Sequence, residues 1–290
     1  MSVLVAAPAS SANLGSGFDC AAVALDLWNE LELLPGDGSV AIEGEGAREL
    51  PRDERHLAVR AFALLAEPSE WSFRFVNRIP LERGLGASAA AIALGLAAGA
   101  AAAGRRLEPV ELLALGAPLE GHLDNLAAAL AGGVCLAWRE GSRPRLARVA
   151  DDLPLAAIAV VPATRVSTAA SRAALPSRVA HDDATTGAAR AALLGAGLAS
   201  GEVELLRLGF ADVLHEPYRL ESAPLLRALR DEPPEDAVGV TLSGSGPTVI
   251  VWAEPDASES CLAELGERFP DASARVLAVA GGVKAREVVA

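Results

Sequence analysis

Lysine is nearly absent from this chain: among its 290 residues, Lys284 is the only lysine. Mechanisms that need a lysine in the middle of a chain, such as a Walker A phosphate loop or a Schiff base, are therefore excluded. Aromatic residues are also scarce, at 4%, although hydrophobic residues reach 51%. Ala, Leu and Val must then fill most of the core, which predicts close backbone packing rather than packing around large rings.

Cysteine is equally sparse. Cys20, Cys135 and Cys261 lie far apart, with no CxxC spacing and no zinc pattern. We expect them to be reduced and mostly buried in a cytoplasmic protein. The N-terminus has no positively charged region and reaches Pro8 early, so no signal peptide is expected.

Positive charge is in deficit, because the formal net charge is −13 and the sequence pI is about 4.8. This balance argues against a general nucleic-acid binder. A phosphate-bearing ligand would have to be bound by backbone dipoles, a metal ion or a few arginines. The one long uncharged run, residues 87–104, is mainly Ala and Gly. It predicts a buried helix rather than a membrane span.

Strand and helix patterns alternate along the chain. Strands are expected at residues 2–7 (ended by Pro8), 23–34, 39–43, 71–79, 134–138, 155–161, 237–242, 248–252 and 275–280. Helices are expected at residues 55–66, 87–103, 109–119, 124–130, 184–199, 202–215, 222–230 and 256–268. This interleaving indicates an α+β or α/β protein. A Gly/Pro/Arg cluster suggests a boundary between domains 1–148 and 149–290.

The most informative segment is residues 80–90, P-L-E-R-G-L-G-A-S-A-A. Gly84 and Gly86 permit a tight loop, and the Ala-rich helix that follows starts with almost no side chains in the way. The unpaired amides of such a helix start form an anion site, and the Ser88 hydroxyl can ligate Mg²⁺. An ordinary strand–turn–helix connection explains the glycines equally well.

Three further segments carry polar residues. Glu120 to Asn125 gathers two carboxylates, an imidazole and an amide, where Asp124 can be a helix N-cap and Glu120 can hold Mg²⁺ if it meets Ser88. Asn13 and Asp19 stand in a small-residue loop that a turn also explains. Residues 242–248, L-S-G-S-G-P-T, need their glycines only if this loop presses on another backbone.

Taken together and in this order, the four segments resemble the GHMP small-molecule kinases. The family signature P-x-x-x-G-L-G-S-S-A matches Pro80 to Ala89, and the C-terminal glycine loop matches Ser243 to Thr248. Within the family the chain is most similar to the branch that phosphorylates L-homoserine. The branch motifs match at Ala7–Asp19, His122–Asn125, Gly132–Gly133, Ser167–Pro176 and Glu216–Arg219.

The resemblance implies an α+β, two-domain GHMP kinase fold. Its N-terminal domain resembles ribosomal protein S5 domain 2, its C-terminal domain is ferredoxin-like, and the site lies between them. The implied reaction is ATP-dependent phosphorylation of the side-chain hydroxyl of L-homoserine to O-phospho-L-homoserine, with Mg²⁺, in threonine biosynthesis. The resemblance also suggests a homodimer.

The family pattern assigns residues to each ligand. Substrate contacts fall on Asn13, Asp19, His122, Asp124, Asn125, Thr168, Arg172 and Arg219, with Asn13, Ser88 and Asn125 expected to serve the reaction itself. ATP contacts fall on His56, Pro80, Leu81, Glu82, Arg83, Gly84, Leu85, Gly86, Ala87, Ser88, Ala89 and Ala90, and metal ligands on Ser88 and Glu120. These residue types suit a zwitterionic substrate, because arginines can bind its carboxylate and aspartates can bind its ammonium group.

The match to the family is not complete. Ala87 replaces the first serine of the signature, and Glu82 puts a negative charge beside the anion site unless Arg83 compensates. His56 stands where relatives often carry an asparagine near the adenine. Asn125 takes the place of the aspartate that activates the hydroxyl in mevalonate kinase and its relatives. We therefore hypothesise that Asn125 positions the hydroxyl and does not deprotonate it.

Other interpretations stay open at this point. Without the motifs, Arg172 and Arg219 would be read as members of surface salt bridges. The chain can also be a GHMP kinase for a mevalonate-like or sugar alcohol substrate. A third possibility is a catalytically silent GHMP-fold protein that binds a metabolite and regulates a partner.

Overall fold

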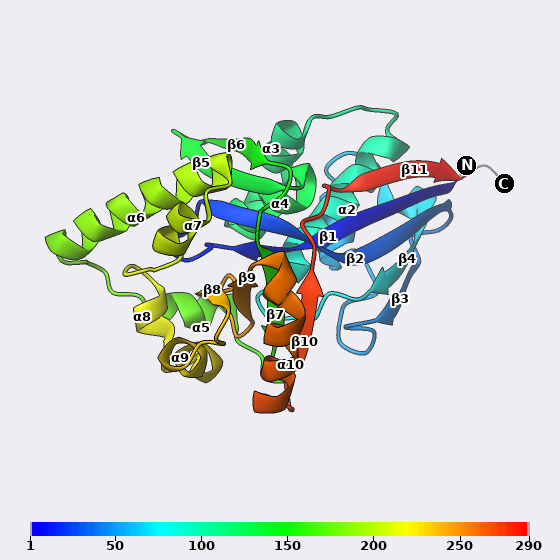
Figure 1. The fold of residues 1–290 in the computed structure, drawn as a ribbon. Coiled ribbons are helices and arrows are strands. Elements are labelled where there is room, and N and C mark those ends of the chain that lie inside the picture. Colours follow the sequence, from blue (N-terminus) through cyan, green and yellow to red (C-terminus); the bar gives the residue numbers. More distant parts are fainter. Residues whose placement is uncertain (1, 289–290) are drawn as a thin grey trace.

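The computed structural model describes residues 2–288, which form two β-sheets and the helices that cover them (Figure 1). The first sheet has the strand order β11-β1-β2-β4-β3, and β5 pairs with both β2 and β6. Its strands are β1 (Ser2–Ala12), β2 (Ala21–Pro35), β3 (Val40–Gly44), β4 (Trp71–Asn77), β5 (Val134–Glu140), β6 (Arg143–Ala150) and β11 (Lys284–Val288).

The second sheet has four strands in the order β10-β7-β9-β8. They are β7 (Ala156–Val161), β8 (Ala237–Leu242), β9 (Val249–Ala253) and β10 (Ser273–Leu277). Helices precede β8 and β10 along the chain, which gives the β-α-β-β-α-β succession of a ferredoxin-like unit. The chain passes from the first sheet to the second after β6, and β11 returns to pair with β1.

Ten α-helices occur between residues 2 and 288. They are α1 (Leu57–Phe62), α2 (Ala87–Ala102), α3 (Pro109–Glu120), α4 (Asp124–Ala131), α5 (Thr168–Ala173), α6 (His181–Ser200), α7 (Val203–Gly209), α8 (Glu216–Arg219), α9 (Pro224–Asp231) and α10 (Ser258–Arg268). Two short 3₁₀-helices span Pro68–Glu70 and Pro255–Ala257. Within this described part, no helix combines the length and the apolar character that crossing a membrane requires.

Helix α2 lies at the centre of the helices that pack on the first sheet. Most of its side chains are buried all round, and it packs against β1, α1, α3 and α4. A Cβ placed on Gly95 would lie 2.0 Å from the Ala58 carbonyl oxygen, so only glycine allows α1 to approach this closely. The scarcity of aromatics is thus matched by backbone-to-backbone contact, as the composition predicts.

Both faces of the second sheet pack against apolar residues. Ile158 and Val160 pack with the apolar residues of α9 and α10, whereas Ala157 and Ala159 on the opposite face join the main core. Trp252 of β9 also belongs to that core and stacks on Phe210, with 5.1 Å between ring centroids. The two sheets therefore share one hydrophobic core, which fixes the loops that run between them.

Most predicted elements are present, but several differ from the prediction. Pro8 does not end the first strand: β1 continues to Ala12 through a bulge between Pro8 and Ala9, where a missing N–H is tolerated. No strand is predicted between residues 138 and 155, yet Arg143–Ala150 forms the hairpin strand β6. Residues 210–215 leave the helical conformation expected for 202–215, and α5, α8 and β11 are absent from the prediction.

Candidate active site

The end of strand β1 and two glycine-bearing loops, from distant parts of the sequence, meet through their backbones. The Ser10 amide donates to the Leu85 carbonyl at 3.1 Å, and the Gly244 amide donates to the Ala12 carbonyl at 3.1 Å. A Cβ on Gly84 would stand 2.2 Å from the Ser243 carbonyl oxygen. The loop 242–248 thus presses on another backbone, but the glycine that this contact requires is Gly84, because a Cβ on Gly244 would lie 3.6 Å from the Gly84 carbonyl oxygen, an ordinary contact distance.

The start of α2 has the form of an anion site. Gly86 caps the helix in the left-handed conformation, with φ 68°, and a Cβ there would lie 2.1 Å from the Ser10 hydroxyl oxygen. The Ala90 amide donates to the Gly86 carbonyl at 2.9 Å. The preceding helical amides, at 87–89, have no acceptor within the helix, so they are available to an anion at the positive end of the helix dipole.

A cavity of about 520 Å³ opens beside this helix start. It is lined by nearly all residues that the sequence singles out, namely Asn13, Asp19, His56, Pro80, Leu81, Glu82, Arg83, Gly84, Gly86, Ala87, Ser88, Glu120, His122, Asp124, Asn125, Thr168, Arg172 and Arg219. Leu85, Ala89 and Ala90 are buried in the core instead. The individual roles of the lining residues stay predictions, but their convergence is a property of the fold.

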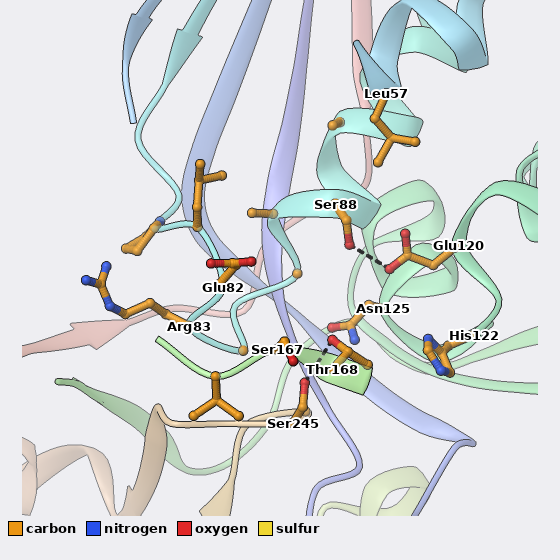
Figure 2. A pocket seen from close by; sticks show the side chains of 18 of the residues that line it. Leu57, Glu82, Arg83, Ser88, Glu120, His122, Asn125, Ser167, Thr168 and Ser245 are labelled. Carbon is orange, nitrogen blue, oxygen red and sulfur yellow. Dashed lines mark hydrogen bonds between the residues drawn. The ribbon is translucent and has the colours of Figure 1, made fainter. Parts of the chain in front are cut away.

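Ser88 and Glu120 come from α2 and the end of α3 and point toward each other (Figure 2). The Ser88 hydroxyl donates to Glu120 Oε1 at 2.7 Å. Burial raises the pKa of Glu120, and the Ser88 hydrogen bond opposes this shift. The two segments thus meet as a magnesium role requires. Within residues 2–288 no group of three or more His, Cys, Asp or Glu side chains is arranged to hold a metal ion alone.

Two arginines and an aspartate also line the cavity. Arg172 Nη2 is 2.5 Å from Asp19 Oδ1. Arg219 is only 2% exposed, and it donates to the Gly244 carbonyl at 3.2 Å and to His215 Nδ1 at 3.0 Å. Arg219 is therefore not part of a surface salt bridge. Arg172 does form an ion pair, but its partner Asp19 also lines the cavity.

Asp124 is a buried acid in this site. It is 3% exposed, and burial together with the nearby Asp19 and Glu120 charges raises the pKa of Asp124 to about 7. Its Oδ1 accepts the Asn125 amide at 2.7 Å. The idea that Asp124 is the helix N-cap is wrong, because the cap residue is Leu123 and Asp124 is the first helical residue.

Two asparagines are fixed by their neighbours. Asn125 Oδ1 accepts the Ser10 hydroxyl at 2.8 Å, which leaves the Nδ2 donors of this residue for a ligand. The Asn13 side chain is engaged at both ends, since it accepts the Asp19 amide at 3.1 Å and donates to the Gly244 carbonyl at 3.0 Å. Asn13 thus shapes the loop that carries Asp19.

The charges around Glu82 differ from the expectation. Arg83 does not neutralise Glu82: its guanidinium donates to the carbonyls of Ala163 and Thr164, at 2.6 and 3.0 Å. Arg165 lies 3.8 Å from Glu82 and pairs with Glu49 at 2.7 Å. Arg165 could not be found from the sequence, because nothing local links residues so far apart along the chain.

His56 and Phe18 also line the walls of the cavity. His56 stacks on Phe75 with 4.4 Å between centroids, and its Nδ1 accepts the Ala58 amide at the start of α1. Burial lowers the pKa of His56 to about 4, so the ring is neutral near pH 7. Phe18 was not singled out by the sequence, although the Arg172 and Arg219 guanidinium groups lie 5.8 and 5.5 Å from its ring centroid.

Comparison with known proteins agrees with this geometry. The model for the GHMP kinases N terminal domain matches residues 56–133, and the model for GHMP kinases C terminal matches residues 189–271. This chain belongs to the GHMP kinase family. The predicted family resemblance and the two-domain GHMP kinase fold are thereby confirmed, and ATP is the co-substrate that a kinase of this family implies.

Relatives within the GHMP kinases refine the placement. A homoserine kinase of Streptomyces coelicolor is 40% identical over 91% of this chain and 88% of its own length. One from Moorella thermoacetica is 38% identical over 86% of both chains. The solved structure of a homoserine kinase from Cytophaga hutchinsonii superposes with a TM-score of 0.85 at 26% identity, over 98% of this chain and 97% of that one. The chain thus falls in the homoserine kinase branch.

Proposed function

We propose that this GHMP kinase transfers the γ-phosphoryl group of ATP to the side-chain hydroxyl of L-homoserine, forming O-phospho-L-homoserine for threonine biosynthesis. The observation that carries the proposal is a single cavity lined by two chemically distinct groups of residues, which we call its phosphate end and its amino-acid end. One end is the amide-lined helix start at Gly86, and the other holds Arg172 and Arg219 beside Asp19. A triphosphate and a small zwitterion need these two environments side by side.

The phosphate end can bind a nucleotide although no lysine lines it. The free amides of α2 face the charge of the triphosphate, and the Ser88 and Glu120 oxygens form a donor set suitable for Mg²⁺. Two protein oxygens are enough, because Mg²⁺ usually keeps waters and substrate phosphates as its remaining ligands. When bound there, the ion would offset phosphate charge. Ser88 and Glu120 would hold it.

The amino-acid end matches homoserine group by group. Arg219 and Arg172 would bind the substrate carboxylate, since guanidinium groups pair with carboxylates through two parallel hydrogen bonds. Asp19 and Asp124 would receive the ammonium group. A bound cation would also favour the ionised form of Asp124.

The hydroxyl lies between the two ends in this proposal, near Asn125. Because Asn125 Oδ1 already accepts the Ser10 hydroxyl, the amide can offer only its Nδ2 donors to the substrate oxygen. A donor can hold the oxygen in line with the γ-phosphorus but cannot remove its proton. Positioning and charge stabilisation then supply most of the catalysis, as is usual for phosphoryl transfer.

Measuring ADP release tests the substrate. The assay compares L-homoserine, L-threonine, mevalonate and a sugar under the same conditions. We expect L-homoserine to be strongly preferred. A preference for mevalonate or the sugar would favour another GHMP activity, and Mg-ATP binding without turnover would favour the regulator.

Arg172→Ala tests the carboxylate assignment. We expect the KM for homoserine to rise roughly tenfold to a hundredfold, the usual effect of losing a charge-assisted hydrogen bond. Arg178→Ala is a matched control, because Arg178 is exposed and does not line the cavity. If Arg172→Ala changes stability but leaves the KM unchanged, the carboxylate assignment is wrong.

Two further properties belong to the proposal. Free thiols at Cys20, Cys135 and Cys261 suit a cytoplasmic enzyme. Assembly as a homodimer is expected from the family alone, and light scattering of the purified protein measures it directly.

A further inference from the structure

We propose that His215 is a positioning residue, whose neutral imidazole holds Arg219 and the loop of Asn13 to Asp19 in the geometry that binds the substrate carboxylate. The inference rests on the proposed function, because it concerns how the homoserine end of the cavity is built. His215 lines neither end of that cavity, so it acts through Arg219 rather than on the substrate.

The hydrogen bonds of His215 define its role. The side chain is 0% exposed, and its two ring nitrogens each have one partner. Nδ1 is 3.0 Å from Arg219 Nη1, and Nε2 is 2.9 Å from the Gly15 carbonyl oxygen. A guanidinium can only donate, so Nδ1 must be the unprotonated acceptor. The ring proton is therefore on Nε2, which donates to Gly15.

These two bonds join segments that are 200 residues apart along the chain. Gly15 belongs to the loop that carries Asp19, whereas Arg219 stands at the end of α8. Phe18 strengthens the connection, because it stacks on His215 with 4.7 Å between centroids and lies beneath the Arg219 guanidinium. One buried ring thus sets the distance between a substrate-side arginine and the loop of the substrate-side aspartate.

The surroundings keep the ring neutral. Asp212 Oδ2 accepts the main-chain amides of His215 and Glu216, both at 2.8 Å, and lies 3.8 Å from Nε2. Arg219 and Arg230 are the nearby cations, and Arg230 pairs with Glu216. Burial lowers the pKa of His215 to about 4, although Asp212 opposes the shift. A second proton would have to bind Nδ1, which already faces the positively charged Arg219 guanidinium.

Two substitutions separate the two bonds. In His215→Asn the amide oxygen can replace Nδ1 and accept from Arg219, whereas in His215→Gln the longer amide can replace Nε2 and donate to Gly15. If the contact with Arg219 is what matters, His215→Gln should raise the KM for homoserine roughly tenfold or more, with the KM for ATP within about twofold of the wild type. His215→Asn should keep both values within about threefold.

The measurement is steady-state kinetics of the full-length wild type and both variants, with thermal melting recorded in parallel. The double variant His215→Gln/Arg219→Ala should be no worse for homoserine than Arg219→Ala alone, because the two residues act as one unit. The inference is overturned if both single variants raise the two KM values together, or if they lower only the melting temperature and the active fraction. A wild type that does not phosphorylate homoserine refutes the proposed function itself, and the inference falls with it.

Discussion

Replacing Asp124 by asparagine should make the protein more stable at pH 8 and less active. Asp124 is buried next to the charges of Asp19 and Glu120, which raises its pKa from 3.8 to about 7. Between these two values the folded protein keeps a proton that the unfolded chain has lost. The carboxyl therefore contributes full stability below about pH 4, and that contribution is lost as the pH rises through 7.

The size of the effect follows from the pKa shift. Between pH 5 and its folded-state pKa of about 7, the Asp124 carboxyl covers about two pH units in which only the folded protein keeps the proton. Each unit changes the free energy of unfolding by about 1.4 kcal/mol. Raising the pH from 5 to 8 therefore lowers the free energy of unfolding by about 3 kcal/mol through this group. The substituted asparagine has no charge to lose, and its Oδ1 can still accept the Asn125 amide. The stability difference between variant and wild type should thus grow by about 3 kcal/mol from pH 5 to pH 8.

Urea unfolding followed by tryptophan fluorescence at pH 5, 6.5 and 8 measures this difference. Glu216, whose pKa burial also raises to about 7, titrates in both proteins and cancels in the comparison. Asp256→Asn, at an exposed position, is the control for a simple change in net charge. Stability curves of wild type and Asp124→Asn that run parallel with pH would refute the reasoning. In the same variant, the KM for homoserine should rise because the ammonium group loses a partner.

Two further substitutions test the loop and the metal pair. Gly84→Ala should destabilise the protein by about 3 kcal/mol or more, because the new Cβ would overlap the Ser243 carbonyl; Gly104→Ala, also at positive φ but with nothing within 4 Å, should cost only about 1 kcal/mol in the same melting experiment. Glu120→Gln keeps an acceptor for the Ser88 hydroxyl but removes the negative charge. The Mg²⁺ concentration that gives half-maximal velocity should therefore rise roughly tenfold. An unchanged Mg²⁺ dependence would argue against a metal role for Glu120.

The secondary structure was predictable wherever a local pattern determines it. The Ala-rich run after Gly86 forms α2, and Pro109 starts α3 as a first-turn proline should. Predictions were wrong where a partner strand overrides the local signal. Pro8 lies inside β1 because β11 pairs only with Ser2 to Ala6, and the bulge after Pro8 absorbs its missing donor. The strand β6 forms because β5 gives it a partner.

The sequence by itself determined the chemistry that the site can offer. It contained the glycines of the phosphate loop, the helix start with its free amides, and the arginines and aspartates that a zwitterion needs, because these depend on residue type and short spacing. Only the tertiary structure decided which of them act together. Ser88 meets Glu120, Arg172 meets Asp19, and Arg165 rather than Arg83 faces Glu82, because the packed sheets bring distant loops to one cavity. The raised pKa of Asp124 likewise comes from burial by other elements, which no local pattern encodes.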